Sequence, residues 1–245
     1  MAVIGIQGLR GGVGTSSLAA ALGWSLQQLG ESVLLIDGSA DNLLRLFFNI
    51  DYDKPRGWAR DTLDNSDWRE SAWRYTSHLD VLPFGQLSGE ERRDPALLNK
   101  LIPAFSAILQ EIEAANRYRW IIIDVPYGEL SYSQPLLALC WRVLMVLNPD
   151  SNCHVRLHQQ PIPKNHHLLV NNLNVSSQLQ SDLFQLWRLS HHGLVPVVVH
   201  RDEAMAECLA AKQPLGEYQP ESLSAREVLT LANWCLLRYA EVRHD

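Results

Sequence analysis

The chain has 245 residues, of which 47% are hydrophobic, and a formal net charge of −6 at pH 7. This length suits one large α/β domain or two small ones, and the acidic balance argues against a protein built mainly to coat nucleic acid. No run approaches the roughly 18 apolar residues of a membrane span, and four scattered cysteines without a CxxC pair indicate buried thiols in a reducing cytosol.

The first forty residues predict a strand–loop–helix–strand unit. Residues 2–7 (AVIGIQ) are short, apolar and β-branched, and a glycine-rich loop over 8–14 follows them. Residues 16–29 predict a helix that Gly30 ends as a C-cap, and residues 32–36 (SVLLI) predict a second buried strand that ends at Asp37. This order is typical of the start of a parallel sheet.

The rest of the chain continues the alternation of helices and strands. Residues 51–78 are rich in tryptophan and charge and predict surface helices; further helices are expected over 97–115 and 224–239. Strands are expected over 80–83, 120–123, 143–147, 167–170 and 195–199. Absent any linker or repeat, we predict a single α/β domain over 1–245, a doubly wound, mostly parallel sheet with helices on both faces.

Polar residues follow the apolar strands of this predicted sheet. They are Asp37, Asp124, Asn148, Asn171 and His200. Because ligands bind at the carboxyl ends of strands in open α/β sheets, these side chains indicate a binding site at that edge.

The loop RGGVGTSS at residues 10–17 has the composition of a phosphate-binding loop. Glycines let backbone N–H groups surround phosphate oxygens, and the following helix adds the positive end of its dipole. A tight turn without a ligand is the alternative, but the position between a strand and a helix favours phosphate. Ser16 stands where such loops place a Mg²⁺-binding hydroxyl, whereas Thr15 occupies the usual lysine position.

RGGVGTSS resembles KGGVGKTT, the deviant Walker A loop of the MinD/ParA ATPases, which are P-loop NTPases. The resemblance implies that Arg10 takes the place of the signature lysine, which reaches the nucleotide of a dimer partner. A guanidinium keeps that charge and offers a forked set of donors. The phosphate contacts implied by the loop fall on Gly11, Gly12, Val13, Gly14, Thr15, Ser16 and Ser17.

Two more segments resemble the acidic motifs of that family. SVLLIDGSADN resembles VLLIDxDxQxN, so Asp37 matches the first aspartate, and YRWIIIDVP resembles the Walker B strand, so Asp124 matches its aspartate. The resemblance implies that Ser16, Asp37 and Asp124 form the Mg²⁺ site and that Arg10 and Asp37 serve catalysis. Ser39 replaces the water-orienting second aspartate, and Asp41 is a possible substitute at the wrong spacing.

The later strand ends resemble the family's base-binding segments. HLLVNN resembles LVINR, which implies that the Asn171 amide reads the adenine edge, and the backbone around His200 and Asp202 is expected to flank the base. VLMVLNPDSNCHVR resembles a MinD segment in which Arg156 matches an arginine at the dimer interface near the nucleotide. A surface arginine on a helix is an equal alternative for Arg156.

Within this superfamily the segments DNLLRL, NCHVRLHQQ and HRDEAMAECLAAKQPLGEY resemble the branch that serves bacterial cellulose biosynthesis. This resemblance implies a cytoplasmic ATP- and Mg²⁺-binding protein, a homodimer across ATP, that is recruited to the inner-membrane cellulose synthase complex, with the cell pole as a possible place of recruitment. Accessory proteins of that secretion complex are the implied partners. Because Thr15 and Ser39 replace a lysine and an aspartate, ATP hydrolysis is expected to be slow or absent.

Two other functions stay open at this point. One is a ParA-type partition ATPase that cycles on DNA, and the other is a scaffold without nucleotide. The acidic charge argues against nucleic acid as a partner, and the intact glycines argue against a nucleotide-free scaffold. The C-terminal AEVRHD lacks the basic amphipathic helix of MinD, so direct membrane insertion is not expected.

A charged and aromatic segment is the remaining candidate surface. Its arginines are interrupted by acids, so a mixed protein-binding face fits better than a DNA-binding one. The residues are Arg56, Arg60, Arg69, Arg74, Trp58, Trp68 and Trp73. The scattered histidines lack metal-ligand spacing.

Overall fold

An eight-stranded sheet forms the centre of the computed structural model, which describes residues 1–128, 130–159 and 162–240. The strand order is β3-β4-β2-β5-β1-β6-β7-β8, and every neighbouring pair is parallel except β3 with β4. The strands are β1 (Ala2–Gly8), β2 (Val33–Asp37), β3 (Trp73–Arg74), β4 (Leu79–Leu82), β5 (Trp120–Val125), β6 (Arg142–Leu147), β7 (His166–Leu173) and β8 (Leu194–His200). The predicted α/β fold with a mostly parallel sheet is confirmed.

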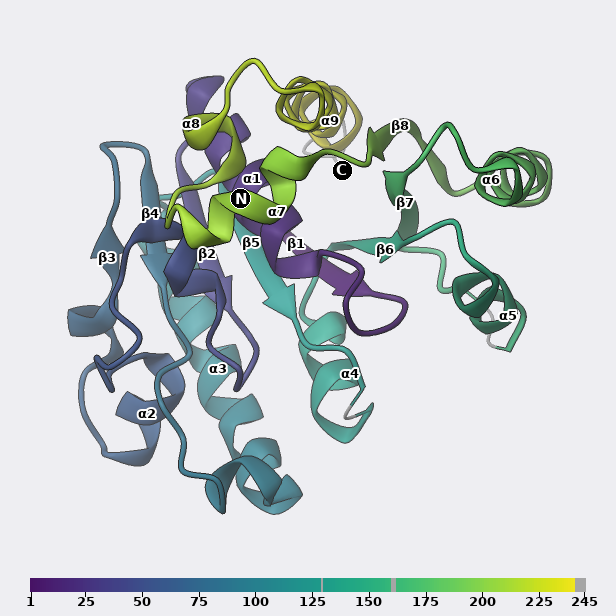
Figure 1. Ribbon diagram of the computed structural model, residues 1–245. Helices are drawn as coiled ribbons and strands as arrows, with labels where there is room; N and C mark the ends of the chain where they lie inside the picture. Colours follow the sequence, from purple (N-terminus) through teal and green to yellow (C-terminus); the bar gives the residue numbers. More distant parts are fainter. Residues whose placement is uncertain (129, 160–161, 241–245) are drawn as a thin grey trace.

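Helices cover both faces of the sheet (Figure 1). The α-helices are α1 (Thr15–Gln28), α2 (Trp58–Leu63), α3 (Pro95–Ala115), α4 (Leu130–Ala138), α5 (Ser151–Gln159), α6 (Gln178–Ser190), α7 (Glu203–Ala210), α8 (Leu215–Tyr218) and α9 (Leu223–Ala240). The described part of the chain also forms short 3₁₀ helices: η1 (Leu44–Phe48), η2 (Trp68–Ser71) and η3 (Glu91–Arg93).

The side chains of each central strand point alternately to the two faces of the sheet, and each face has its own hydrophobic core. In β2, Leu35 belongs to the core under α1 and α9, whereas Leu34 and Ile36 belong to the core under α3 and α4. In β5, Ile122 faces the first core and Ile123 the second. Successive side chains of a strand point to opposite faces, so a strand buried on both sides must be apolar throughout.

The expectation of surface helices over residues 51–78 is confirmed only in part. This segment holds only α2, η2 and the two-residue strand β3, joined by loops. Trp58, expected in an exposed aromatic patch, is fully buried, and its ring lies 5.1 Å from Phe84 and 4.7 Å from Phe105 between ring centroids. A tryptophan buries enough apolar surface to override the polar character of its neighbours.

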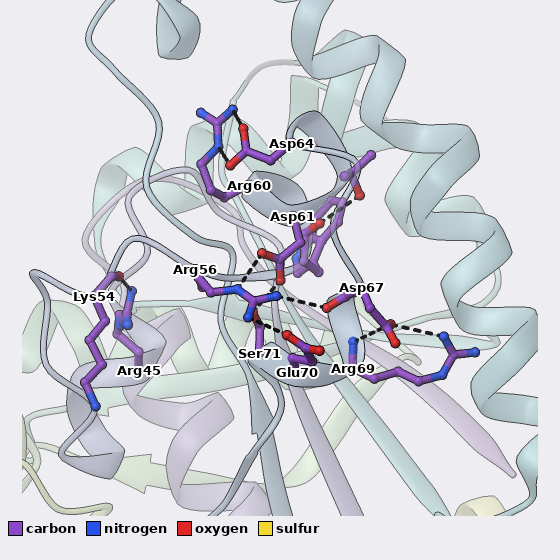
Figure 2. Close-up of polar contacts among 12 residues, drawn as sticks. Arg45, Lys54, Arg56, Arg60, Asp61, Asp64, Asp67, Arg69, Glu70 and Ser71 are labelled. Atoms are coloured by element: carbon purple, nitrogen blue, oxygen red, sulfur yellow. Dashed lines mark hydrogen bonds and ion pairs between the residues drawn. The ribbon is translucent and has the colours of Figure 1, made fainter.

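The charged residues of this segment pair with one another (Figure 2). Arg56 contacts Asp61 at 3.0 Å and Glu70 at 2.8 Å, whereas Arg60 contacts Asp64 at 2.6 Å. Such a network leaves little unpaired positive charge on this surface. No described helix is long and apolar enough to cross a membrane.

Candidate functional site

The loop between β1 and α1 has a backbone that requires glycine. Gly12 has φ 74° and Gly14 has φ 90°, and a Cβ added to Gly14 would lie 2.6 Å from Nδ2 of Asn171. Helix α1, described in full, has no acidic residue in its first turn and no side-chain cap. Its first backbone N–H groups are therefore available to an anion at the positive end of the helix.

Two buried carboxylates lie side by side next to this loop. Asp37 at the end of β2 pairs in register with Asp124 of β5, and both residues are buried. Burial and the charge of Asp124 raise the pKa of Asp37 well above its usual range. Burial also raises the pKa of Asp124 to about 6, although the Ser16 hydroxyl donates to it and lowers it.

This arrangement fits a hard divalent cation. Ser16, Asp37 and Asp124 offer oxygen ligands, which Mg²⁺ prefers, and a cation would offset the repulsion between the carboxylates. The Asp37 oxygens accept hydrogen bonds from the backbone N–H of Ser39 at 2.9 Å and of Leu44 at 3.0 Å. Each carboxylate oxygen has a further lone pair that a metal or its water can use.

Asp41 does not join the carboxylate pair. Its side chain is 76% exposed and lies 4.0 Å from Arg92, and its backbone N–H donates to the Ser39 hydroxyl at 3.2 Å. The structure therefore leaves a serine hydroxyl at the position where family members with two aspartates hold the second carboxylate.

Arg10 lies folded against its own chain. Its Nη2 atom is 2.6 Å from Oδ2 of Asp150, and its Nη1 donates to the Gly11 carbonyl at 2.7 Å. Burial works to raise the pKa of Asp150, but the Arg10 hydrogen bond and the Cys153 N–H bring it below its usual range. Arg10 is thus paired within the subunit.

A cavity of about 210 Å³ opens beside the glycine loop. It is lined by Gly12, Val13, Gly14, Ser17, Asn148, Asn171, Asn172, His200, Asp202, Met205 and Ala206. The structure thus brings Asn171, His200 and Asp202 together at the loop, although they come from the ends of two different strands.

Most polar groups of these three residues already have partners. Asn171 donates through Nδ2 to the Val13 carbonyl at 2.7 Å, and Asp202 caps α7 by accepting from Ala204 N–H at 3.1 Å. The His200 N–H donates to Glu227 of α9, whose carboxylate also contacts Nδ1. Asn171 therefore braces the loop, and Asp202 fixes the backbone that flanks the cavity.

Arg156 lines a different cavity from Asn171, His200 and Asp202. Its guanidinium sits over the Tyr127 ring, 5.5 Å from the centroid, and Nε donates to Asn152 at 2.7 Å. It lines a second cavity of about 640 Å³ together with Tyr127 and with Gly8 and Leu9, the first residues of the glycine loop. Arg156 thus lies near the start of that loop but does not line the cavity that holds Asn171 and His200.

Sequence reasoning missed four residues that shape the site. Asp150 holds Arg10, Glu227 holds His200, and Trp58 and Tyr132 donate to the backbone carbonyls of Asp37 and Gly38. The sequence could have indicated Asp150, because the tripeptide NPD at residues 148–150 follows a strand that ends at the edge of the sheet where the site lies. The other three lie far from their partners in sequence, and nothing in the sequence indicated them.

The chain is similar in sequence to known proteins along nearly its whole length. A family model described as "Cellulose biosynthesis protein BcsQ" matches residues 1–236. BcsQ of Salmonella typhimurium is 55% identical over 240 residues, which covers 98% of this chain and 96% of that protein. BcsQ of Escherichia coli is 53% identical over 243 residues, which covers 99% and 97% respectively.

Solved structures share the fold at low identity. MinD from Pyrococcus horikoshii, complexed with Mg-ADP, has a TM-score of 0.73 at 20% identity and covers 99% of both chains. Cobyrinic acid a,c-diamide synthase from Mycobacterium smegmatis, with an ATP analogue and magnesium, has a TM-score of 0.73 at 19% identity. That match covers 99% of this chain and 96% of the synthase.

Proposed function

Because the chain belongs to the family of the cellulose biosynthesis protein BcsQ, we propose that it is an ATP-binding P-loop protein that assists bacterial cellulose synthesis. The main observation that supports nucleotide binding is the carboxylate pair of Asp37 and Asp124, which lies beside Ser16 and the glycine loop. A single P-loop NTPase domain over residues 1–245 is part of this proposal.

Different residues of the site would contact the phosphates, the metal ion and the base of Mg²⁺–ATP. Backbone N–H groups of residues 11–17 hold the phosphates, and Ser16, Asp37 and Asp124 hold Mg²⁺ directly or through water. The base occupies the cavity beside Gly14, where Asn171 and His200 lie. Mg²⁺, when bound, neutralises charge on the phosphate oxygens.

Slow or absent hydrolysis follows from two positions. Thr15 offers no positive charge to the transferring phosphoryl group, and the Ser39 hydroxyl accepts from Asp41 N–H, where related ATPases use a carboxylate to orient water. ATP then acts mainly as a ligand that joins two subunits.

Calorimetry tests nucleotide binding. Protein shown to be free of nucleotide is titrated with ATP in Mg²⁺, and Asp124→Asn serves as the variant with an impaired metal site. Heat in the wild type, reduced in the variant, supports the proposal. No heat at tens of micromolar wild-type protein contradicts it.

Dimerisation across ATP requires Arg10 to leave Asp150. The Arg10–Asp150 ion pair is only partly buried, with 26% and 32% of the two side chains exposed. Breaking it in water therefore costs little free energy. Arg10→Ala removes the guanidinium that would reach the partner's phosphates, whereas Asp150→Asn only releases it. An ATP-dependent dimer that survives in Asp150→Asn and is lost in Arg10→Ala, by light scattering, supports the in-trans role; an unchanged dimer in Arg10→Ala contradicts it.

The cellular role follows from the family. We infer a cytoplasmic protein recruited to the inner-membrane cellulose synthase complex through its accessory proteins. A fluorescent fusion in cells with and without the synthase genes tests the placement. Identical diffuse fluorescence in both strains, with normal cellulose output from cells that lack this protein, would overturn it.

A further inference from the structure

The turn that follows β2 is hydrogen-bonded to β5, α2 and α4. Asp37 ends β2, and the next residue, Gly38, donates its N–H to the Asp124 carbonyl at 2.9 Å. A Cβ on Gly38 would lie 2.7 Å from that same oxygen, so the two backbones approach more closely than another residue would permit. The turn is therefore locked to the end of β5 directly beside the carboxylate pair.

Trp58 of α2 makes the second attachment. Its indole Nε1 donates to the Asp37 carbonyl at 2.8 Å, and the whole side chain is buried between Phe84 and Phe105. A buried carbonyl at the end of a strand needs a donor, and this one comes from a residue outside the sheet. The aromatic contacts hold the indole in place.

Tyr132 of α4 makes the third. Its hydroxyl donates to the Gly38 carbonyl at 3.0 Å, and 1% of the residue is exposed. Trp58 and Tyr132 approach the turn from different helices and take two successive carbonyls.

We propose that Trp58 and Tyr132 are positioning residues that hold the Asp37 turn so that its carboxylate and that of Asp124 remain opposed for a divalent cation. Two carboxylates in low dielectric repel each other, and a free turn would relax by rotating Asp37 away. The two donors oppose that relaxation. This inference rests on the proposed Mg²⁺–ATP function.

The test pairs each site variant with a control variant that loses the same group away from the carboxylate pair. Tyr132→Phe removes the hydroxyl that contacts the turn. Its control, Tyr118→Phe, removes a hydroxyl that lies just before β5 and donates to Asp80 at 2.6 Å. Trp58→Phe removes one indole N–H; Trp120→Phe removes another, which donates to Glu31 at 2.8 Å. Trp120 precedes Asp124 by about 13 Å of strand.

The measurement is the Mg²⁺ concentration that half-saturates binding of a fluorescent ATP analogue, with thermal stability read in parallel. A lost hydrogen bond of ordinary strength corresponds to about a threefold to tenfold change. We expect Tyr132→Phe and Trp58→Phe to raise the half-saturating Mg²⁺ concentration by that factor, and Tyr118→Phe and Trp120→Phe to leave it unchanged.

Three outcomes overturn the proposal: an unchanged Mg²⁺ requirement in both site variants, an equal rise in the control variants, or unfolding of the site variants under conditions where the controls stay folded. The last would show that the contacts maintain the fold and not the metal site. The wild-type titration separates this inference from the proposed function, because a wild type that binds nucleotide without Mg²⁺, or not at all, contradicts the function itself.

Discussion

Replacing Asp124 by asparagine is expected to stabilise the nucleotide-free protein. The side chain is buried opposite Asp37, and burial raises the pKa of Asp124 to about 6. The pKa of an exposed aspartate is about 3.9, and the difference corresponds to about 3 kcal/mol of unfolding free energy at pH 8. Asparagine keeps the shape and an acceptor for the Ser16 hydroxyl but removes the charge.

The pH dependence gives this prediction its sign. A carboxyl whose pKa is raised in the folded chain carries no penalty below about pH 4, where both states are protonated. The penalty grows as pH rises from 4 to 6 and is complete above about pH 7. Asp124→Asn should therefore gain about 3 kcal/mol at pH 8 and about half of that at pH 5.

Urea unfolding at both pH values measures this gain, and a melting temperature higher by about 6–12 °C at pH 8 should accompany it. Asp80→Asn is the matched control. Asp80 is also a buried carboxylate, but Arg74 and Arg117 contact it at 3.1 Å and 3.0 Å, so the control should lose stability. A variant at Asp124 that is no more stable than wild type at pH 8, or equally stabilised at both pH values, would refute the reasoning.

Three further predictions concern other parts of the molecule. Burial and two histidines of α5 lower the pKa of His191, so its protonation favours the unfolded chain and His191→Gln should lessen the loss of stability below pH 6.5 in urea titrations. Gly14→Ala forces a side chain into φ 90° against Asn171; a loss of about 1–3 kcal/mol and of ATP binding by calorimetry should result. Thr15→Lys with Ser39→Asp restores two groups of active relatives, and phosphate release should rise; several ATP per second from the unaltered protein would contradict the slow-turnover proposal.

The sequence predicted the sheet because its strands are buried on both faces. Runs such as WIII at residues 120–123 must be apolar at every position, and a polar residue follows each run near the carboxyl end of its strand. That pattern predicts that Asp37, Asp124 and Asn171 lie at one edge of the sheet.

The partners of those side chains could not be predicted in the same way. Asn171 donates to Val13 across 158 positions of sequence, and Arg10 meets Asp150 across 140. Trp58 lies among charged residues that predict an exposed surface, but it packs against Phe84 and Phe105 in the second core and is buried there. Such contacts depend on how the layers pack, which local composition does not encode.

The charges of the site explain why binding and chemistry can separate. Asp37 and Asp124 repel an anion, Arg10 is neutralised by Asp150, and position 15 carries a hydroxyl where related ATPases carry an ammonium. Backbone N–H groups are then the main donors to phosphate, and they contact the ground state and the transition state alike. A site of this kind gains affinity from the cation that joins carboxylates to phosphate, but it has little that strengthens as charge develops on the phosphoryl group. These charges therefore predict the tight Mg²⁺–ATP binding with slow turnover that we propose, and a long-lived bound state is what a subunit that serves partners in this way would need.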